Sequence, residues 1–164
     1  MPSLLDLPPE LAARGFALRP AAPGDEGFVR DAHRQAYERV VTEQFGAWDP
    51  ERQAAFAAAA LAGPGLMLLE RDGVACGYAR VDDHDDELGL RELVLVPAEQ
   101  GRGVGSALLA RLQERAAARG AAITLEVLHR NRARALYERC GFVRTSSTPT
   151  HHRMRWSPPT GLSR

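Results

Sequence analysis

Three glycines at alternating positions, Gly101, Gly103 and Gly105, have the spacing in this chain that most directly suggests chemistry. They follow an apolar run that ends at Pro97, and they precede a segment whose apolar residues recur with helical spacing. The first N–H groups of a helix lack partners within the helix and lie at the positive end of its dipole. Because glycines let an anion approach these amides closely, the pattern predicts a site for a phosphate-bearing ligand.

Two common nucleotide-binding patterns fit this loop less well. A P-loop requires a Lys-Ser or Lys-Thr pair after its last glycine, and this chain contains no lysine. A dinucleotide-binding fingerprint can be aligned on Gly101, Gly103 and Ser106, with Glu126 as the acid that binds the ribose. That fingerprint turns directly out of its strand, whereas residues 97–100 separate the strand from the first glycine here. A dinucleotide-binding module is therefore the weaker alternative.

Acid–base chemistry could be carried by one tyrosine and by carboxylates near the same loop. Tyr137 lies in a short helical segment downstream of the glycines, and Glu92 lies on the strand that leads into them. A tyrosine hydroxyl can act as a proton donor, and a carboxylate can act as a proton acceptor. Glu87 and Glu126 are alternative bases on strand-like runs.

The elements that would position these residues follow from apolar periodicity and turn residues. Strands are predicted at 16–19, 66–70, 74–81, 87–96, 122–128, from 141 and at 151–156, and helices at about 23–41, 50–61, 104–119 and 131–140. The segment 42–48 interrupts the helical pattern, and 82–86 reads as a turn. Asp72-Gly73 predicts a tight hairpin turn. A strand–helix–strand crossover makes 87–96 and 122–128 parallel neighbours.

The composition is that of one soluble globular domain. The chain has 164 residues, of which 45% are apolar, and its 21 basic and 21 acidic residues cancel. We therefore expect neither nucleic acid nor a membrane surface as a partner. The two cysteines, Cys76 and Cys140, form no disulfide framework, and no leader or membrane span is evident, so we expect a cytoplasmic protein. We expect an N-terminal arm at 1–15, one domain at 16–157 and a disordered tail at 158–164.

Two segments resemble a known family. The segment Gln100-Gly101-Arg102-Gly103-Val104-Gly105 looks like the acyl-CoA pyrophosphate signature of the GCN5-related N-acetyltransferase (GNAT) superfamily. A second segment, Asn131-Arg132-Ala133-Arg134-Ala135-Leu136-Tyr137-Glu138-Arg139-Cys140-Gly141-Phe142, resembles the helix and turn that follow in that family. By order of elements, the resemblance spans about residues 16–156. Two motifs in the right order are much stronger than either alone.

The resemblance implies a mixed α/β fold: a twisted, mostly antiparallel sheet with one splayed parallel strand pair and about four helices. It also implies an N-acetyltransferase that moves an acetyl group from acetyl-CoA to a primary amine by direct attack in a ternary complex. Tyr137 would be the general acid for the departing thiolate and would also touch the cofactor. The remaining implied cofactor-binding residues are Val94, Leu95, Val96, Gln100, Gly101, Arg102, Gly103, Val104, Gly105, Ser106 and Asn131. No metal is implied.

On the acceptor side, the resemblance implies that Tyr37, Phe45 and Trp48 contact the amine. Glu92 is the expected general base, although several relatives carry a glutamate at the position of Leu90; a water held by Glu43 or Tyr37 is the alternative. The acceptor would be a small-molecule amine or a peptide N-terminus. Relatives frequently form homodimers. The alternative function is a non-catalytic acyl-CoA-binding sensor or partner module.

Overall fold

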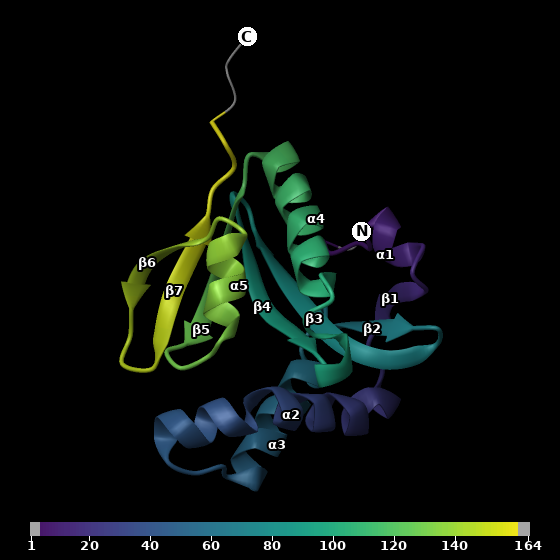
Figure 1. Cartoon of the computed structure of the whole chain (residues 1–164), viewed down its shortest axis with the longest axis vertical. Helices are drawn as coiled ribbons and strands as arrows, with labels where there is room; N and C mark the ends of the chain where they lie inside the picture. The colour runs from purple at the N-terminus through teal and green to yellow at the C-terminus, as the bar shows by residue number, and fades with distance from the viewer. Residues whose placement is uncertain (1–3, 161–164) are drawn as a thin grey trace.

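The computed structural model describes residues 4–160, in which a seven-stranded sheet is flanked by helices (Figure 1). The helices are α1 (Pro9–Ala12), α2 (Glu26–Phe45), α3 (Pro50–Ala62), α4 (Val104–Arg119) and α5 (Ala133–Arg139), with 3₁₀ turns at Pro23–Asp25 and Pro97–Glu99. The strands are β1 (Phe16–Pro20), β2 (Met67–Arg71), β3 (Val74–His84), β4 (Glu87–Leu95), β5 (Ala122–Leu128), β6 (Val143–Ser147) and β7 (His151–Trp156).

The strand order is β1-β2-β3-β4-β5-β7-β6, and only β4 and β5 run parallel. The fold class predicted from the sequence is therefore confirmed: a mixed α/β fold with a mostly antiparallel sheet and one parallel pair. The sheet excludes the open parallel architecture of a dinucleotide-binding domain, because β5 is followed by an antiparallel partner, β7. The tight turn predicted at Asp72-Gly73 joins β2 to β3, and both residues have positive φ, of 50° and 82°.

Two predicted element ends were wrong by three or more residues. The first long helix does not end near Val41 but continues to Phe45, where Gly46 adopts a φ of 87° and donates its N–H to the Thr42 carbonyl. An ion pair one helical turn apart, between Arg39 and Glu43, supports this extra turn. The strand predicted to end at Val81 continues to His84, so the turn before β4 is shorter than expected.

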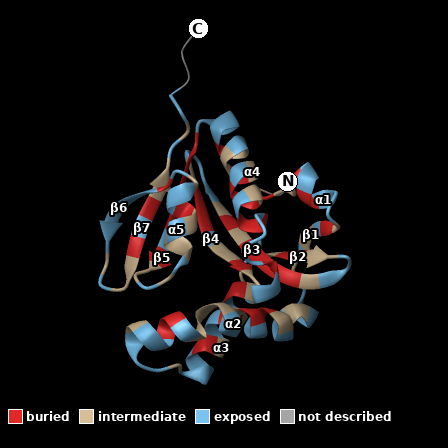
Figure 2. Cartoon of the chain, viewed as in Figure 1, coloured by how far each residue is buried: buried red, intermediate tan, exposed pale blue. Residues whose placement is uncertain are grey.

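The helices cover the two faces of the sheet with separate apolar clusters (Figure 2). On one face, α4 and the end of α5 pack on β3, β4, β5 and β7, and Leu88, Leu109 and Ile123 are at most 1% exposed. On the other face, α2 and α3 pack on β2, β3 and β4 through Val29, Leu68 and neighbouring residues. Consequently the α2–α3 pair and the α4–α5 pair lie on opposite sides of the central strands.

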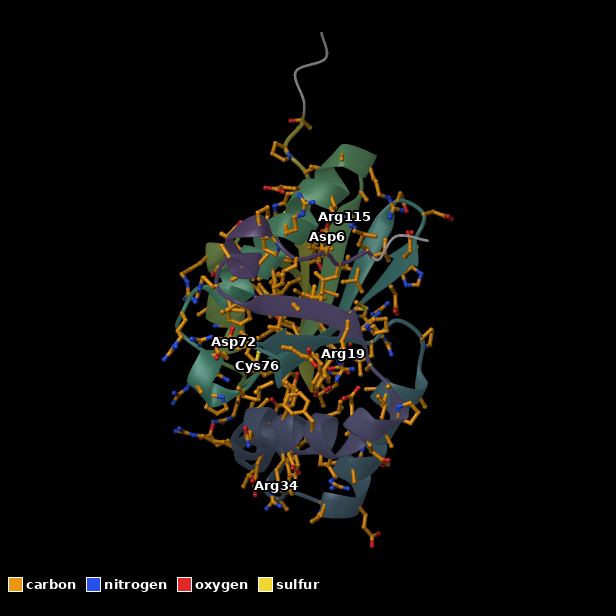
Figure 3. The ribbon with its side chains drawn as sticks, turned by 90° about the vertical axis from the view of Figure 1, so that its right-hand side faces the viewer. Asp6, Arg19, Arg34, Asp72, Cys76 and Arg115 are labelled. Atoms are coloured by element: carbon orange, nitrogen blue, oxygen red, sulfur yellow. The ribbon has the colours of Figure 1, made fainter. Side chains whose placement is uncertain are left out.

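The described part of the N-terminal segment packs against β1 and α4. Leu11 is fully buried, and the Asp6 carboxylate accepts two hydrogen bonds from Arg111, at 3.0 and 2.8 Å, and lies 3.3 Å from Arg115 (Figure 3). These ion pairs lower the pKa of Asp6, the hydrogen bond from Arg111 being the main cause. Residues 1–3 of the predicted arm and 161–164 of the predicted tail lie outside the described residues. No helix in the described part has both the length and the hydropathy needed to cross a membrane.

Leu88 lies on β4 just before the point where β4 and β5 separate, and it is fully buried. We expect Leu88→Ala to lower the free energy of unfolding by about 3 kcal/mol, because it removes buried methyl groups and leaves a cavity. The matched strand control is Val74→Ala, where the side chain is 69% exposed and the change should stay within about 0.5 kcal/mol. Urea unfolding measures both. Equal effects of the two substitutions would contradict this description of the core.

Candidate active site

The parallel strands β4 and β5 pair over only three residues and then separate. Glu87, Leu88 and Gly89 face Ala122, Ile123 and Thr124, and no pairing follows toward the carboxyl ends of the two strands. Figure 1 shows the gap between the lower parts of β4 and β5. Backbone groups that would otherwise form sheet hydrogen bonds are therefore available to a ligand over the last part of β4.

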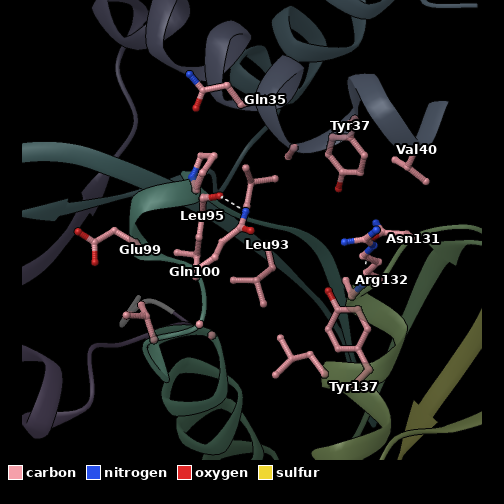
Figure 4. Close-up of a pocket in the computed structure, with 18 of the residues that line it drawn as sticks. Gln35, Tyr37, Val40, Leu93, Leu95, Glu99, Gln100, Asn131, Arg132 and Tyr137 are labelled. Atoms are coloured by element: carbon pink, nitrogen blue, oxygen red, sulfur yellow. Dashed lines mark hydrogen bonds between the residues drawn. The ribbon is translucent and has the colours of Figure 1, made fainter. Parts of the chain in front are cut away.

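The hydrogen bonds on the other edge of β4 show which backbone groups face this gap. The N–H of Val96 donates to the Cys76 carbonyl at 2.9 Å, and therefore points toward β3. Successive residues of a strand point their backbone groups to opposite sides. The backbone N–H and C=O of Val94 therefore also point toward β3, while those of Leu93 and Leu95 point into the gap. The Leu95 carbonyl accepts a hydrogen bond from the side chain of Gln100 at 2.9 Å (Figure 4).

The glycine loop between β4 and α4 presents backbone amides rather than side chains. Gly101 and Gly103 have φ of 71° and 78°, and a Cβ on either would meet no atom within 4 Å. This backbone conformation strongly favours glycine, and the open space in front of it leaves the amides accessible. No described side chain caps the first turn of α4. The amides at its N-terminus are thus suited to bind an anionic group such as a diphosphate.

A cavity of about 630 Å³ extends from this loop along the gap between β4 and α5; we call it the loop-side cavity. Its lining includes these predicted cofactor-binding residues: Val94, Leu95, Gln100, Gly101, Gly103, Val104, Gly105, Ser106, Asn131 and Tyr137. Val96 and Arg102 are outside the lining, and the Arg102 carbonyl accepts a hydrogen bond from Arg14 at 3.2 Å. Most of the residues predicted to hold one ligand therefore lie around one space.

A second cavity of about 770 Å³ lies between the α2–α3 pair and the sheet; we call it the helix-side cavity. Phe45 lines it, as does Phe56 of α3, and both rings are about half exposed. Trp48 does not line either cavity but packs against the ring of His33, with centroids 5.8 Å apart. His33 does line the helix-side cavity, and it forms a 2.9 Å hydrogen bond with Gln53. Burial lowers the pKa of His33, and that hydrogen bond partly opposes the effect.

The two cavities share four lining residues: Tyr37, Leu93, Asn131 and Tyr137. Figure 4 shows the hydroxyl groups of Tyr37 and Tyr137 directed into the space between α2 and α5. Neither hydroxyl forms a hydrogen bond with another described residue. A ligand in one cavity can therefore meet a ligand in the other at these two tyrosines.

Tyr137 is only 8% exposed and packs edge-on against Phe142. Burial raises the pKa of Tyr137 to about 12, with smaller contributions from the Glu92 carboxylate and Cys140. The pKa of Tyr37 is also raised, first by burial and then by Glu92 and Tyr137. Both phenols are consequently protonated at neutral pH and can act as hydrogen-bond or proton donors.

Glu92 faces the helix-side cavity because a β-bulge resets the strand just before it. The strand register between β3 and β4 shifts at this point: Val81 lies opposite Leu90 and Arg80 lies opposite Glu92, so Arg91 has no cross-strand neighbour on β3. Glu92 therefore shares a face with Val94, toward α2 and α3. Its carboxylate forms no hydrogen bond or ion pair within the described residues, and burial raises its pKa while Arg80 opposes the shift. Such a group is suited to accept a proton.

Leu90, before the bulge, is 6% exposed and packs in the core cluster beneath α4. Leu90 is the position at which, by the resemblance, several relatives carry a glutamate. In this chain the position holds a buried hydrocarbon side chain. Of the other acidic candidates, Glu87 is bound by Thr124 and Arg155, at 2.9 Å each, and Glu126 is bound by Arg153 at 3.0 Å. Of these three glutamates, Glu92 is therefore the one whose carboxylate has no partner in residues 4–160.

One side chain joins α2, which packs on β2 to β4, to the β5–β7 side of the sheet. Gln44, near the end of α2, donates to the Thr150 carbonyl at 2.8 Å and accepts from the Arg130 N–H at 3.2 Å. These are the hydrogen bonds that join α2 to the β5–β7 side in the described part of the chain. Gln44 therefore fixes the last turn of α2, and with it Phe45, above the gap.

Asn131 begins the α5 region, although the helix starts two residues later, at Ala133. The N-cap position is occupied by Arg132, so the predicted cap was one residue too early. The Asn131 side-chain oxygen nevertheless accepts a hydrogen bond from the Ala133 N–H at 2.9 Å. Asn131 also lines both cavities. Asn131 therefore contacts the start of α5, the helix that carries Tyr137, and also lines the place where the two cavities join.

Among the residues of the helix-side cavity that were not predicted from the sequence, three could contact a ligand through a charge or an aromatic ring: Arg80, Arg52 and Phe56. The position of Arg80 opposite Glu92 depends on the bulge, which no residue pattern indicates. Arg52 and Phe56 lie one turn apart on α3, with the guanidinium 5.7 Å from the ring centre, and this spacing was a usable signal. No group of three or more His, Cys, Asp or Glu within residues 4–160 is arranged to hold a metal ion.

Solved structures of acetyltransferases share this fold. The PaiA N-acetyltransferase from Thermoplasma acidophilum, in complex with coenzyme A, aligns with a TM-score of 0.67 and 14% identity over 87% of this chain and 98% of that chain. The ribosomal-protein-S18-alanine N-acetyltransferase from Escherichia coli aligns with a TM-score of 0.63 and 22% identity, covering 90% and 97%. The protein yncA from Salmonella typhimurium, with its cofactor acetyl-CoA, aligns with a TM-score of 0.54 and 21% identity, covering 91% and 97%.

At such low identity, these alignments establish similarity of fold alone. The search of curated proteins found no significant match. The family assignment comes from the sequence itself, which matches the model of the "Acetyltransferase (GNAT) family" over residues 29–142. This match includes most of α2, the splayed strands, the glycine loop and Tyr137. The chain therefore belongs to the GNAT acetyltransferase family.

Proposed function

We propose that this protein transfers the acetyl group of acetyl-CoA to a primary amine by direct attack within a ternary complex. The observation that carries this proposal is the meeting of the loop-side and helix-side cavities at Tyr37, Leu93, Asn131 and Tyr137. One cavity begins at amides suited to a diphosphate, and the other contains an unpartnered carboxylate. The thioester and the amine would meet where the two cavities join.

The loop-side cavity fits acetyl-CoA in its charge pattern. The diphosphate would bind at the amides of residues 101–106, where glycines leave the backbone open and the α4 dipole favours negative charge. The pantetheine arm would then follow the unpaired edge of β4 at Leu93 and Leu95, in the manner of an added strand. This pose would put the thioester beside Tyr137.

The reaction requires a base, a stabilised oxyanion and an acid. Glu92 would remove a proton from the ammonium group, directly or through water, and the free amine would attack the thioester carbon. A backbone N–H of β4 that faces the gap would stabilise the negative charge that develops on the thioester oxygen. As the C–N bond forms and the C–S bond breaks, Tyr137 would protonate the leaving thiolate, and the second proton that the nitrogen loses on becoming an amide would restore the phenol.

No covalent acyl-enzyme is included in this proposal. The four residues shared by the cavities contain no thiol, hydroxymethyl or amine group, and neither Cys76 nor Cys140 lines a cavity. The acceptor would be a small-molecule amine or a peptide N-terminus; the similar Escherichia coli enzyme is named for an alanine of a ribosomal protein. The cytoplasmic location and the homodimer expected from the sequence remain predictions.

A second candidate function is acyl-CoA binding without catalysis. The observation that favours it is Leu90, whose buried hydrocarbon occupies the position where several relatives have a glutamate. Release of free thiol from acetyl-CoA in the presence of an amine panel distinguishes the two functions. Tight CoA binding with no amine-dependent thiol release would favour the non-catalytic one.

Gly103→Glu should abolish detectable CoA binding, because it places a bulky carboxylate at the proposed diphosphate site and disfavours the required positive φ. Isothermal titration calorimetry with CoA measures this. Gly120→Glu is a matched control: Gly120 has a φ of 66° and open space, but it lies at the carboxyl end of the same helix. Unchanged affinity in the Gly103 variant would remove the loop from the CoA site.

Tyr137→Phe should lower kcat by about 100-fold while leaving the affinity for CoA nearly unchanged, because it removes a proton donor and little packing volume. Steady-state kinetics and calorimetry provide the two quantities. Tyr78→Phe is the control, since Tyr78 is buried near Glu92 but lines neither cavity. If the Tyr137 variant retains the full rate, another group protonates the thiolate.

Glu92→Gln should lower kcat by about 100-fold and remove the loss of activity that accompanies protonation of the base at low pH. The raised pKa of Glu92 means that the folded state binds this proton more tightly than the unfolded chain. Its contribution to stability is therefore fully present below the unfolded pKa and is lost as pH rises through the folded pKa. The variant should consequently have a higher Tm than the unmodified protein at neutral pH, and this difference should disappear in acid.

The control for this substitution is Glu126→Gln, because Glu126 lines the same cavity but is exposed and paired with Arg153. It should keep most of the activity and show no gain in Tm at neutral pH. If instead Glu126→Gln removes activity and Glu92→Gln does not, the base has been assigned to the wrong strand.

A further inference from the structure

The helix-side cavity contains a cation and an anion that face each other without forming an ion pair. Arg80 on β3 and Glu92 on β4 are direct cross-strand partners on the same face of the sheet. Side chains at such positions are close enough to interact. Nevertheless, the Arg80 guanidinium pairs with Asp82, at 3.3 Å, and not with Glu92. The space between the carboxylate and the guanidinium is therefore open to a ligand.

Arg80 is held in place but incompletely satisfied. Its buried Nε is the atom that lies 3.3 Å from the Asp82 carboxylate, and it makes no hydrogen bond there. Its Nη1 lies beside the end of α3, where a Cβ on Gly63 would come to 3.0 Å. Asp82, its ion-pair partner, also accepts a hydrogen bond from Arg91 at 3.1 Å. Two arginines thus share one carboxylate at this end of the cavity, which leaves positive charge for an anionic ligand group.

The order of the groups along the cavity indicates how a ligand would lie. Glu92 lines the helix-side cavity next to Leu93, which together with Tyr37 and Tyr137 also lines the loop-side cavity, so Glu92 lies near the place where the two cavities join. Arg80 lies on the neighbouring strand, β3, on the side of Glu92 away from β5. An amine at Glu92 would therefore lie next to the thioester, and an attached anion would extend toward Arg80.

The outer wall of the cavity is apolar. Phe45 and Phe56 are half exposed, and Val41 completes the wall from α2. Large exposed rings at the mouth of a cavity gain stability when an apolar group covers them. This wall would contact whatever side chain projects from the carbon that carries the amine.

We infer that the acceptor is a free α-amino acid with a large apolar side chain, whose amino group lies at Glu92 and whose carboxylate binds Arg80. This inference rests on the proposed function and specifies its substrate class. An α-amino acid carries its amino and carboxylate groups on one carbon atom, which suits a cation and an anion at cross-strand positions. The apolar side chain then meets Phe45 and Phe56.

The same charges disfavour acceptors with several amines. Of the acidic residues that line this cavity, Asp49 accepts a hydrogen bond from the Arg52 N–H and Glu126 is paired with Arg153. Within the described residues, Glu92 is the one of these three carboxylates that accepts no hydrogen bond and forms no ion pair, while Arg52, Arg80 and Arg91 line the same space. A second or third ammonium group of a polyamine would therefore meet positive charge.

The test compares four acceptors with the full-length protein and acetyl-CoA: L-phenylalanine, L-phenylalanine amide, phenylethylamine and spermidine. Thiol release gives the rates, and mass spectrometry identifies the acetylated products. We expect kcat/KM for phenylalanine to exceed that of each other acceptor by at least about 10-fold, because only phenylalanine supplies the carboxylate. Equal or better turnover of the amide, phenylethylamine or spermidine overturns the inference and leaves the proposed function intact.

Arg80→Gln should abolish this preference. We expect the ratio of kcat/KM for phenylalanine to kcat/KM for phenylethylamine to fall by at least about 10-fold, while the affinity for CoA stays unchanged. The ratio cancels any effect that loss of the Arg80 charge has on Glu92, because both acceptors use the same base. Arg80→Lys keeps the charge and should retain part of the preference, and it also serves if the glutamine variant folds poorly. Arg34→Gln is the matched control, because Arg34 lies on the outer face of α2 and lines neither cavity (Figure 3).

A binding measurement separates failure of this inference from failure of the proposed function. L-phenylalanine is titrated calorimetrically into the protein saturated with CoA. Binding that Arg80→Gln weakens by at least about 10-fold supports the carboxylate site even if no acceptor is acetylated, and that result would contradict the proposed catalysis instead. Absence of both binding and turnover of phenylalanine overturns the inference.

Discussion

The site depends on the short pairing of β4 with β5. Three residue pairs at the start of the two strands hold the halves of the sheet together, and the strands then separate. Unpaired backbone is normally unfavourable inside a protein, because each buried N–H or C=O needs a partner. Here the separation opens the space in which both cavities meet, so a missing set of sheet hydrogen bonds becomes the binding edge for a ligand.

The surrounding elements make that separation stable. On one face α4 packs against β4 and β5 through fully buried leucines, and on the other α2 and α3 cover β2 to β4. The pair is joined by the crossover through α4, whose N-terminus points its free amides at the same gap. The strand edge, the helix dipole and Tyr137 are thus brought together by one βαβ unit and the helix that follows it.

Much of this arrangement could be predicted from local patterns. The bounds of β5 and β7, the Asp72-Gly73 turn and the glycine loop all follow from short-range periodicity and turn chemistry. The end of α2 was harder to predict, because residues 42–45 show little apolar periodicity. Their helical conformation is instead supported by the ion pair between Arg39 and Glu43, and the helix ends at Gly46. All of these features depend on the local sequence. For the end of α2, however, several weak local interactions compete, and the sequence alone does not show which of them determines where the helix ends.

The position of the β-bulge, at Arg91, could not be predicted from the residue pattern, and the acceptor side of the site depends on it. A bulge reverses which side chains face which cavity, so Leu90 packs beneath α4 while Glu92 faces α2 and α3. Its position is determined by the pairing of β4 with β3, a long-range property that no short segment encodes. Arg80 became recognisable as a partner of Glu92 only once that register was known.

The Gln44 bridge determines how rigid the cleft is. The β5–β7 side is joined to α2 by the two hydrogen bonds of this one side chain in the described part of the chain, each contributing on the order of 1 kcal/mol. Breaking both would require only about 2 kcal/mol, so thermal motion would populate a wider cleft in a few per cent of molecules. Breathing of this kind needs no rupture of the sheet, and it offers a bulky product a route of exit while the scaffold stays folded.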